Sequence, residues 1–312
     1  MSMRLGISLA AGIAVVAAAG LAWAQVPPDF AATLKEIGPR IEVQRTGAFY
    51  AAALPPSAVY AGVYASRDIA FGSDPRQKLD VITAADTKPG GKRPVLVFVH
   101  GGGFTGGDKH GQNSVFYDNL MAWAARNGMV GVNVNYRLAP AAPWPAGAED
   151  LASAVAWTRA NIGRYGGDPD KVYLWGHSVG ATHVADYLAH DQFHPKGGAG
   201  VKGAILTSGQ VYDLVGPQVT AAYYGTDASR YPSMASLPGL LKTRVRLFLN
   251  SAEHDPAPFR EQTMKLKDAL CAAKRCPVYV DLKDHNHISE TYAIGTDDRS
   301  LSDPVLKFVR GR

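Results

Sequence analysis

The sequence lacks a cysteine close to its N-terminal apolar run, a block of basic residues, and any internal repeat or low-complexity tract. Without a cysteine after the apolar run, a lipoprotein anchor is not expected. The formal net charge of +5 is spread along the chain, so the pI of about 9.1 predicts no nucleic-acid partner. No stretch after residue 24 is long and apolar enough to span a membrane, and we expect no stable membrane insertion of the mature chain.

The first 24 residues have the pattern of a cleaved signal peptide. Arg4 precedes an uncharged run at residues 5–21, and Ala22-Trp23-Ala24 has the small-x-small pattern of a cleavage site. An uncleaved anchor is the alternative, because a run of roughly 17 apolar residues nearly spans a bilayer. The run is rich in alanine and glycine and therefore only weakly hydrophobic. We predict a signal peptide at residues 1–24 and an exported protein, either periplasmic or secreted.

Cys271 and Cys276 are the only two cysteines, and they lie between a predicted helix and a predicted strand. Export into an oxidising compartment favours a disulfide that closes this short loop. Two free buried thiols are the alternative. We predict the disulfide, as a local staple with no catalytic role.

Residues 25–312 alternate between strand-like and helix-like patterns, without an interdomain linker. Several strands are apolar at consecutive positions, which is typical of strands covered on both faces. The pattern therefore predicts one α/β domain with a mostly parallel central sheet and helices on both faces. The predicted strands are 79–83, 95–99, 131–135, 172–175, 204–207, 245–250 and 278–282. The predicted helices are about 30–37, 112–127, 147–162, 179–189, 258–273 and 303–309. Lid elements are expected at about 25–65 and in the long aromatic segment 210–241.

Ser178 is the candidate nucleophile, in the segment Gly176-His177-Ser178-Val179-Gly180. A buried strand precedes it and a helix with small first-turn residues follows it, so Ser178 is predicted to lie on a strand-to-helix turn. A nucleophile elbow needs this arrangement, because the tight turn strains the serine backbone and the glycines let neighbouring chain pack closely. The helix N-terminus adds a positive dipole end beside a developing negative charge.

The segment His100-Gly101-Gly102-Gly103-Phe104 directly follows another buried strand. The glycines could simply form a flexible loop. That interpretation does not explain why the segment lies at the carboxyl edge of a strand, where open α/β sheets bind ligands. Backbone amides preorganised around an oxyanion are worth roughly 3–4 kcal/mol per donor. We assign the oxyanion hole to the amides of Gly102, Gly103 and Val179.

The candidate acid is Asp255, which follows the predicted strand 245–250. Glu253, two positions nearer the strand, is the competitor. A simple N-cap role for Asp255 is disfavoured by Pro256 and by its distance from the following helical pattern.

The candidate base is one of two histidines, His285 or His287, because no other histidine follows the acid. The resulting chain order of serine, acid and histidine is the order that α/β-hydrolases use. The two histidines could instead suggest a zinc site, but two ligands without a nearby third are a weak signal. We predict no metal and no other cofactor.

Four segments together resemble the carboxylesterases of the hormone-sensitive-lipase-like group and the related arylformamidase-like esterases. They are His100–Gly103, Asn135–Pro140, Gly166–Pro169 and Gly176–Gly180. The resemblance, over residues 79–309, implies the α/β-hydrolase fold, ester substrates with modest acyl chains, and Asp255 as the acid in a D-P segment. The segment from His287 to Glu290 departs from the usual His-Gly-Phe and is similar to relatives in which an apolar residue and a nearby Glu follow the histidine. That similarity favours His287 over His285.

The resemblance and the residues together imply a serine hydrolase that cleaves small carboxylic esters of small to medium acyl chain through an acyl-enzyme intermediate. An amide-directed hydrolase with the same triad and a catalytically inactive binding module are the alternatives. Aromatic residues near these motifs are candidates for pocket walls, although core packing explains them equally well. They are Phe104, Trp144, Tyr223 and Tyr224. The sequence does not indicate an oligomeric state.

Separate alanine variants test the choice between the two histidines. His287→Ala should reduce turnover of a p-nitrophenyl ester by roughly 10³-fold or more, since loss of the base removes proton transfer from the serine. His285→Ala should remain within about tenfold of the unmodified protein. Equal and mild losses from both variants would refute the choice of His287.

Overall fold

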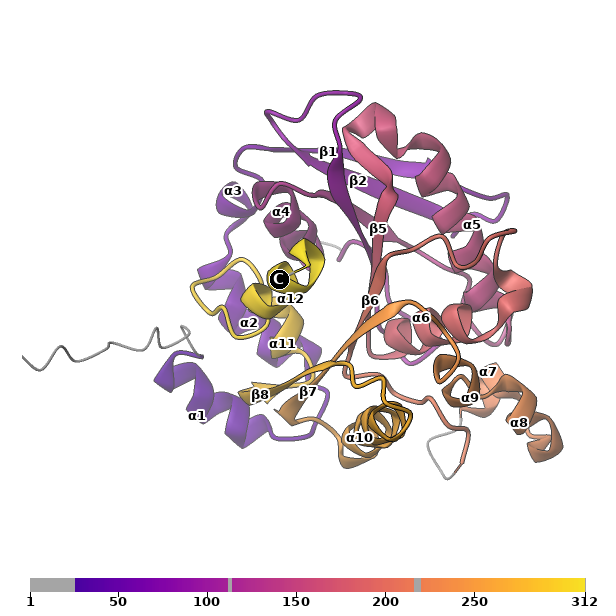
Figure 1. Ribbon diagram of the computed structural model, residues 1–312. Helices are drawn as coiled ribbons and strands as arrows, with labels where there is room; N and C mark the ends of the chain where they lie inside the picture. The colour runs from indigo at the N-terminus through magenta and orange to yellow at the C-terminus, as the bar shows by residue number, and fades with distance from the viewer. Residues whose placement is uncertain (1–25, 112–113, 216–219, 312) are drawn as a thin grey trace, which may run out of the picture.

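The computed structural model describes residues 26–111, 114–215 and 220–311. The predicted signal peptide, residues 1–24, lies outside the described residues. Eight strands form one sheet in the order β1-β2-β4-β3-β5-β6-β7-β8 (Figure 1). The strands are β1 Val63–Ala70, β2 Lys78–Ala84, β3 Arg93–Val99, β4 Val130–Val134, β5 Gly167–His177, β6 Gly203–Thr207, β7 Arg246–His254 and β8 Val278–Asn286. The pairs from β4 to β8 are parallel, whereas β1 and β2 join the sheet in antiparallel pairs.

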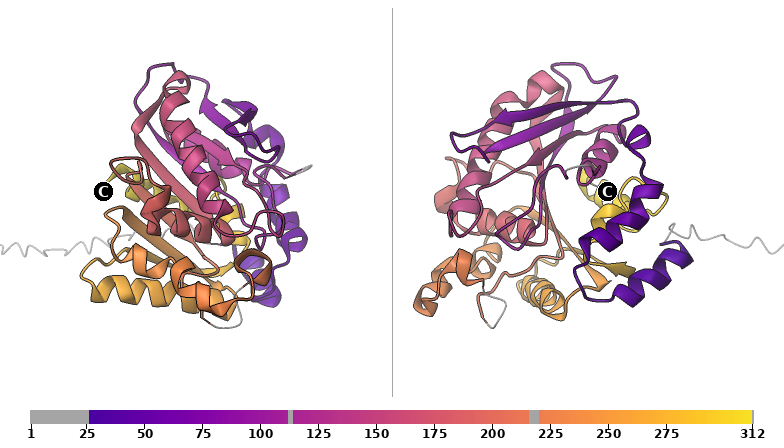
Figure 2. Two further views of the ribbon diagram at one scale, coloured as in Figure 1. Left: turned by 90° about the vertical axis from the view of Figure 1, so that its right-hand side faces the viewer. Right: turned by 180° about the vertical axis from the view of Figure 1, so that it is seen from behind.

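Helices cover both faces of the sheet, as Figures 1 and 2 show. The longer helices are α1 Pro28–Ile37, α2 Val43–Ala53, α4 Asp118–Arg126, α5 Ala146–Asn161, α6 Val179–Ala189, α10 Ala257–Ala272 and α12 Ser302–Arg310. The short α-helices are α3 Pro56–Val59, α7 Ala221–Tyr224, α8 Tyr231–Met234, α9 Leu237–Leu240 and α11 Ser289–Tyr292. Three 3-10 turns complete the set: η1 Ile162–Tyr165, η2 Asp191–Phe193 and η3 Ala228–Arg230. This is the α/β-hydrolase arrangement that the sequence predicts.

The alternation of side chains along the central strands divides the apolar core into two layers. On β3, Val95, Val97 and Val99 join the cluster beneath α5, α6 and α10. Leu96 and Phe98, at the intervening positions, join the cluster beneath α4 and α12. Successive side chains of a strand point to opposite faces, so a consecutive apolar run is the pattern that a doubly covered strand requires.

The N-terminal part of the structure contains elements that the sequence pattern does not predict. β1 is an edge strand whose side chains are mostly exposed and are interrupted by Ser66, Arg67 and Asp68, so an apolar pattern search passes over it. α2 contains a glycine and β-branched residues, and its stability comes from tertiary packing rather than from propensity. Tyr50 of α2 is buried, and Asn286 Nδ2 donates to Thr46 Oγ1 at 3.2 Å. The predicted helix 112–127 begins later, at Asp118.

A disulfide joins Cys271, in α10, to Cys276, just before β8. The pairing that the sequence predicts is therefore present, and it links the helix to the strand that follows. None of the helices in the described residues is both long and apolar enough to cross a membrane.

Candidate active site

The segments that the sequence singles out meet at one edge of the sheet, where the parallel strands end. The glycine loop follows β3, Ser178 follows β5, Asp255 follows β7, and His287 follows β8. In open α/β sheets the carboxyl ends of the strands border the ligand crevice. The parallel order of these strands thus brings together residues that are far apart in the sequence.

Ser178 has a strained backbone at the start of α6. Its φ is 57° and its ψ is −126°, a conformation that L-residues rarely adopt. Glycines on either side make the turn possible, because a Cβ at Gly176 would lie 2.4 Å from Gly180 O. A Cβ at Gly180 would lie 2.1 Å from Val99 O, at the end of β3. Close backbone contact, and not flexibility, is therefore the reason for both glycines.

His287 and Asp255 form a buried hydrogen-bonded pair. His287 Nδ1 lies 2.8 Å from Asp255 Oδ1, and because a carboxylate only accepts, Nδ1 carries the proton. Nε2 is then the basic nitrogen, and it has no hydrogen-bond partner among the described residues. His287 and Ser178 both line the same cavity. This tautomer is the one that a general base for Ser178 requires.

The competing residues lie in other contacts. His285 is buried with Nδ1 2.9 Å from Ser289 Oγ, and its Nε2 lies 3.0 Å from both Ser300 Oγ and Asp298 Oδ2. Glu253 is exposed and accepts the backbone N–H of Asp284 at 3.1 Å. The structure therefore brings His287 and Asp255 together, and it places His285 and Glu253 elsewhere.

The glycine loop lies directly against the nucleophile. A Cβ at Gly101 would lie 2.9 Å from the Cβ of Ser178. Gly102 and Gly103 have φ values of 134° and 62°, in the region that favours glycine. Val179 is the first residue of α6, so its amide has no acceptor within the helix. The glycine loop and the first residue of α6 thus lie next to Ser178.

A cavity of about 1210 Å³ opens above Ser178 and His287. Its walls are mostly apolar, and α2 supplies small side chains to them, including Ala48 and Ala51. The aromatic side chains that line it are Tyr60, Phe116, Tyr117, Phe259 and Tyr292. Because these walls are largely uncharged, the cavity suits an uncharged organic group.

The aromatic residues proposed from the sequence as pocket walls do not line this cavity. Phe104, Tyr223 and Tyr224 are buried in a separate cluster, where Phe104 stacks on Tyr223 at a centroid distance of 4.5 Å. Trp144 lines a smaller hollow beside Arg137. Phe104, Tyr223 and Tyr224 are therefore core residues, in agreement with the alternative that the sequence analysis left open.

The two predicted lid segments contribute unequally to the cavity. From the segment 210–241, the described residues supply only Gln210 to the lining. α9 of that segment packs against α6, beside the core. The N-terminal segment supplies a larger part of the lining, through α2 and its flanking residues.

The structure adds three polar residues around the pair that the sequence analysis did not select. Ser208 lies at the end of β6, with its Oγ 2.6 Å from Asp255 Oδ2 and 2.9 Å from Glu290 Oε2. Glu290 is fully buried, and its pKa is raised well above the ordinary value by burial and then by the charge of Asp255. His177 Nε2 donates to the carbonyl oxygen of His287 at 2.8 Å. The sequence analysis notes Glu290 three positions after His287, but the sequence does not indicate that Glu290 is buried.

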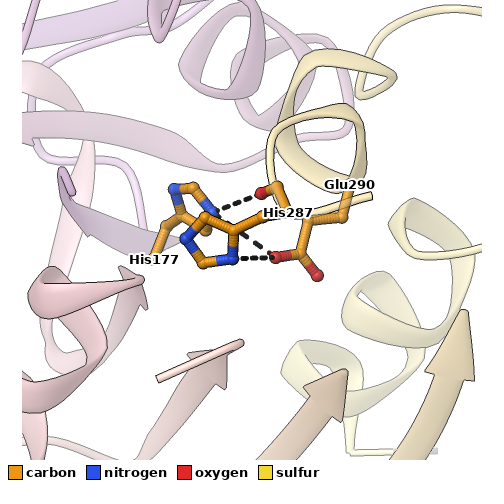
Figure 3. A group of neighbouring side chains, drawn as sticks. All are labelled: His177, His287 and Glu290. Carbon is orange, nitrogen blue, oxygen red and sulfur yellow. Dashed lines mark hydrogen bonds and ion pairs between the residues drawn. The ribbon is translucent and has the colours of Figure 1, made fainter. Parts of the chain in front are cut away.

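Figure 3 shows His177, His287 and Glu290 pointing toward one another. Among the described residues they are the one group of three whose ligand atoms, all within 4.8 Å of one another, could hold a metal ion. However, His287 Nδ1 already donates to Asp255, and His177 Nε2 already donates to the His287 carbonyl. Both nitrogens carry protons where a metal would need lone pairs, so the group suits hydrogen bonding rather than metal binding.

Comparison with known proteins finds similarity to esterases over part of the chain. Residues 79–198 match the BD-FAE family. Among curated relatives, Esterase LipQ of Mycobacterium tuberculosis is 39% identical over 123 residues, covering 39% of this chain and 28% of LipQ. Esterase LipC of the same organism is 37% identical over 129 residues, covering 40% of this chain and 30% of LipC. The chain thus spans less than a third of the length of these relatives.

Solved structures share the fold over almost the whole chain. A bacterial heroin esterase has a TM-score of 0.67 at 22% identity, covering 92% of this chain and 98% of that chain. A hyperthermophilic esterase from Pyrobaculum calidifontis has a TM-score of 0.63 at 20% identity, covering 92% of this chain and 98% of that chain. The protein therefore has the α/β-hydrolase fold, and its segment 79–198 is similar to the BD-FAE family.

Paired variants test which acid orients the base. Asp255→Asn should reduce ester turnover by roughly 10³- to 10⁴-fold, because an amide at this position no longer selects the tautomer with a proton on Nδ1. Glu253→Gln is the matched control, and it should change turnover by less than about twofold. A larger loss from Glu253→Gln than from Asp255→Asn, in steady-state assays of folded protein, would contradict the assignment.

Proposed function

We propose that this protein hydrolyses carboxylic esters, with Ser178, His287 and Asp255 as the catalytic triad. The observation that carries the proposal is the meeting of three features at one cavity. These are the strained Ser178, the His287 imidazole with its free Nε2, and the glycine loop beside both. The similarity to the esterases LipQ and LipC supports the same reaction class.

The reaction follows from the positions of these groups. Ser178 Oγ attacks the ester carbonyl, while His287 Nε2 takes its proton and later returns it to the departing alcohol. Asp255 holds the imidazole in the required tautomer and stabilises the imidazolium. The amides of Gly102, Gly103 and Val179 donate hydrogen bonds to the developing oxyanion. Water then attacks the acyl-enzyme in the same way and releases the acid.

The preferred substrate is a small-molecule ester with an uncharged acyl group of small to medium length. The cavity walls favour this class, since burial of an anionic or cationic group against apolar and aromatic side chains is costly without a partner. No cofactor takes part in the steps above.

We also propose that the protein is exported to the periplasm or the medium. The pattern of residues 1–24 carries this proposal. The disulfide between Cys271 and Cys276 supports it, because disulfides persist mainly in oxidising compartments.

Replacement of the nucleophile is the direct test of the reaction. Ser178→Ala should reduce the turnover of p-nitrophenyl acetate and butyrate by about 10⁴-fold or more, because no acyl-enzyme forms. An unchanged circular dichroism spectrum and melting temperature would show that the fold is intact. Residual activity within about tenfold of the unmodified protein would contradict the proposal.

A panel of matched substrates separates the remaining alternatives. Ester hydrolysis should exceed hydrolysis of the corresponding anilides, and the reverse ranking would indicate an amide-directed hydrolase. Labelling of Ser178 by a fluorophosphonate should be complete, whereas failure to label would indicate an inactive binding module. Activity should survive a chelator, and its loss would indicate a metal-dependent reaction.

Filling the cavity from α2 tests where the substrate binds. Ala48 lines the cavity, whereas Ala52, on the same helix, is exposed and does not. Ala48→Trp should lower kcat/KM for a p-nitrophenyl octanoate by about tenfold or more relative to the acetate, because the indole occupies space that the longer chain needs. Ala52→Trp is the control and should leave the ratio within about twofold. Equal chain-length profiles for the two variants would place the acyl chain elsewhere.

A further inference from the structure

A chain of buried hydrogen bonds runs beneath the His287–Asp255 pair, across three strands. Trp175 Nε1, on β5, lies 2.8 Å from Thr207 Oγ1 at the end of β6. Thr207 Oγ1 lies 2.8 Å from Asn250 Oδ1 on β7, and Asn250 Nδ2 lies 2.7 Å from Glu290 Oε2. All four side chains are fully buried, so their polar atoms depend on one another for partners.

The direction of this chain follows from its first member. An indole N–H can only donate, so the Thr207 hydroxyl accepts from Trp175 and donates its own proton onward to Asn250 Oδ1. The amide NH₂ of Asn250 is then the group that faces Glu290. Glu290 Oε2 therefore accepts a hydrogen bond from Asn250.

The next link joins Ser208 to Asp255 and Glu290. Its two hydrogen bonds need two protons, whereas the serine hydroxyl supplies only one. Ser208 Oγ lies within hydrogen-bond distance of both Asp255 Oδ2 and Glu290 Oε2, but a hydroxyl has only one proton. If both acids were ionised, one of these two contacts would join two acceptors. One of the two acids must therefore be protonated and donate to Ser208, which then donates to the other.

Asp255 is the better supported anion of the two. It accepts the backbone N–H of Ala252 at 2.8 Å, the hydroxyl of Ser208, and His287 Nδ1–H. Glu290 accepts only from Asn250, and its Oε1 has no hydrogen-bond partner in the described part of the chain. Donors stabilise the charged form of a carboxyl, so the additional proton belongs on Glu290.

We propose that Glu290 is a positioning residue, held as a neutral carboxylic acid, which donates through Ser208 to fix the Asp255 carboxylate that orients His287. The role rests on the proposed ester hydrolysis, in which Asp255 and His287 act as acid and base. The donor chain thus runs from Trp175 through Thr207, Asn250, Glu290 and Ser208, and it ends on the one ionised carboxylate of the site.

The surroundings of Glu290 agree with a neutral acid. The titratable groups that face it are Asp255 after β7, His177 on β5, His287 after β8, and the phenols Tyr117 and Tyr212. None of these is a lysine or an arginine. The pKa of His177 is lowered well below its usual value by burial and by His287, so this imidazole supplies no positive charge. Within the described part of the chain, Glu290 therefore has no fixed cationic partner that would stabilise its ionised form.

The neutral state matters for the base. Glu290 Oε1 lies 3.9 Å from His287 Nδ1 and 3.4 Å from His177 Nε2 (Figure 3). An ionised Glu290 would place a second negative charge beside the imidazole and favour its protonated, inactive form before the reaction begins. A neutral Glu290 supports the geometry of Asp255 without adding that charge.

An infrared difference spectrum reads the protonation state without any substrate. The spectrum of the unmodified protein minus that of Glu290→Gln, at pH 7, should contain the C=O stretching band of a protonated carboxylic acid. Asp186 is another buried acid, with its pKa raised to about 8 by burial, and its band cancels because it is present in both proteins. Absence of the difference band, with only a carboxylate band lost, would overturn the proposal.

The pH–rate profile reads the same charge during turnover. Glu290→Gln replaces one neutral group with another, so the acid limb of kcat/KM should move by less than about 0.3 pH unit. Removal of a true negative charge at this distance would shift that limb to lower pH by about one unit or more, and such a shift would overturn the proposal. The glutamine NH₂ can still donate to Ser208, although it no longer accepts from Asn250, so kcat should remain within about fivefold of the unmodified protein.

Two further variants separate positioning from simple bulk. Glu290→Ala and Ser208→Ala both break the donor chain, and each should lower kcat by roughly 10- to 100-fold with KM within about twofold, because neither side chain itself lines the substrate cavity. Equal kcat values for Glu290→Ala and Glu290→Gln would contradict a hydrogen-bonding role. If Glu290→Ala does not fold, Glu290→Gln carries the test alone. Failure of the unmodified protein to cleave any ester would refute the proposed function, whereas the infrared result on Glu290 would stand.

Discussion

The contact on which the site depends is the close approach between the first turn of α6 and the end of β3. Gly180 packs so tightly on Val99 that a Cβ would lie 2.1 Å from its carbonyl oxygen. That approach places the glycine loop after β3 beside Ser178, the residue that begins the helix. The strain in the Ser178 backbone persists because the surrounding strand, helix and loop are all packed. The positions of the proposed nucleophile and oxyanion donors therefore follow from one backbone contact between α6 and β3.

Burial decides the chemistry of the groups around this contact. Several neighbouring groups donate hydrogen bonds to Asp255. Glu290 is also buried, but fewer groups donate to it, and both acids contact Ser208. In a low-dielectric interior two adjacent carboxylates do not both ionise without cations, so their environments separate their roles. His177 contributes a hydrogen bond to the His287 backbone and not a charge. The site thus combines four buried titratable groups with one negative charge directed at the base.

Part of the cavity wall comes from α2 and the residues before it, where the sequence has no clear periodic pattern. α2 lines the cavity with small side chains, and Ile41 and Val43 at its start are unusually exposed for apolar residues. α2 is attached to the sheet by few polar contacts, of which Thr46 with Asn286 is one. Under the proposed function, the substrate range therefore depends on a helical segment outside the sheet, and the reaction depends on residues that the sheet positions.

Local patterns in the sequence were sufficient for the sheet, the disulfide and the position of Ser178, because consecutive apolar strands, glycines and strand-to-helix turns are local properties. β1 and α2 were not predictable in this way, since exposed edge strands and helices held by packing have weak local signals. The choice of His287 over His285 rested on resemblance until the fold brought only His287 to Asp255. Phe104, Tyr223 and Tyr224 were assigned to the wrong surface, because an aromatic side chain packs equally well in a core or a pocket wall. The roles of Glu290 and Ser208 were not predictable from the sequence. Their hydrogen bond joins residues 82 positions apart, so it exists only after the strands have paired.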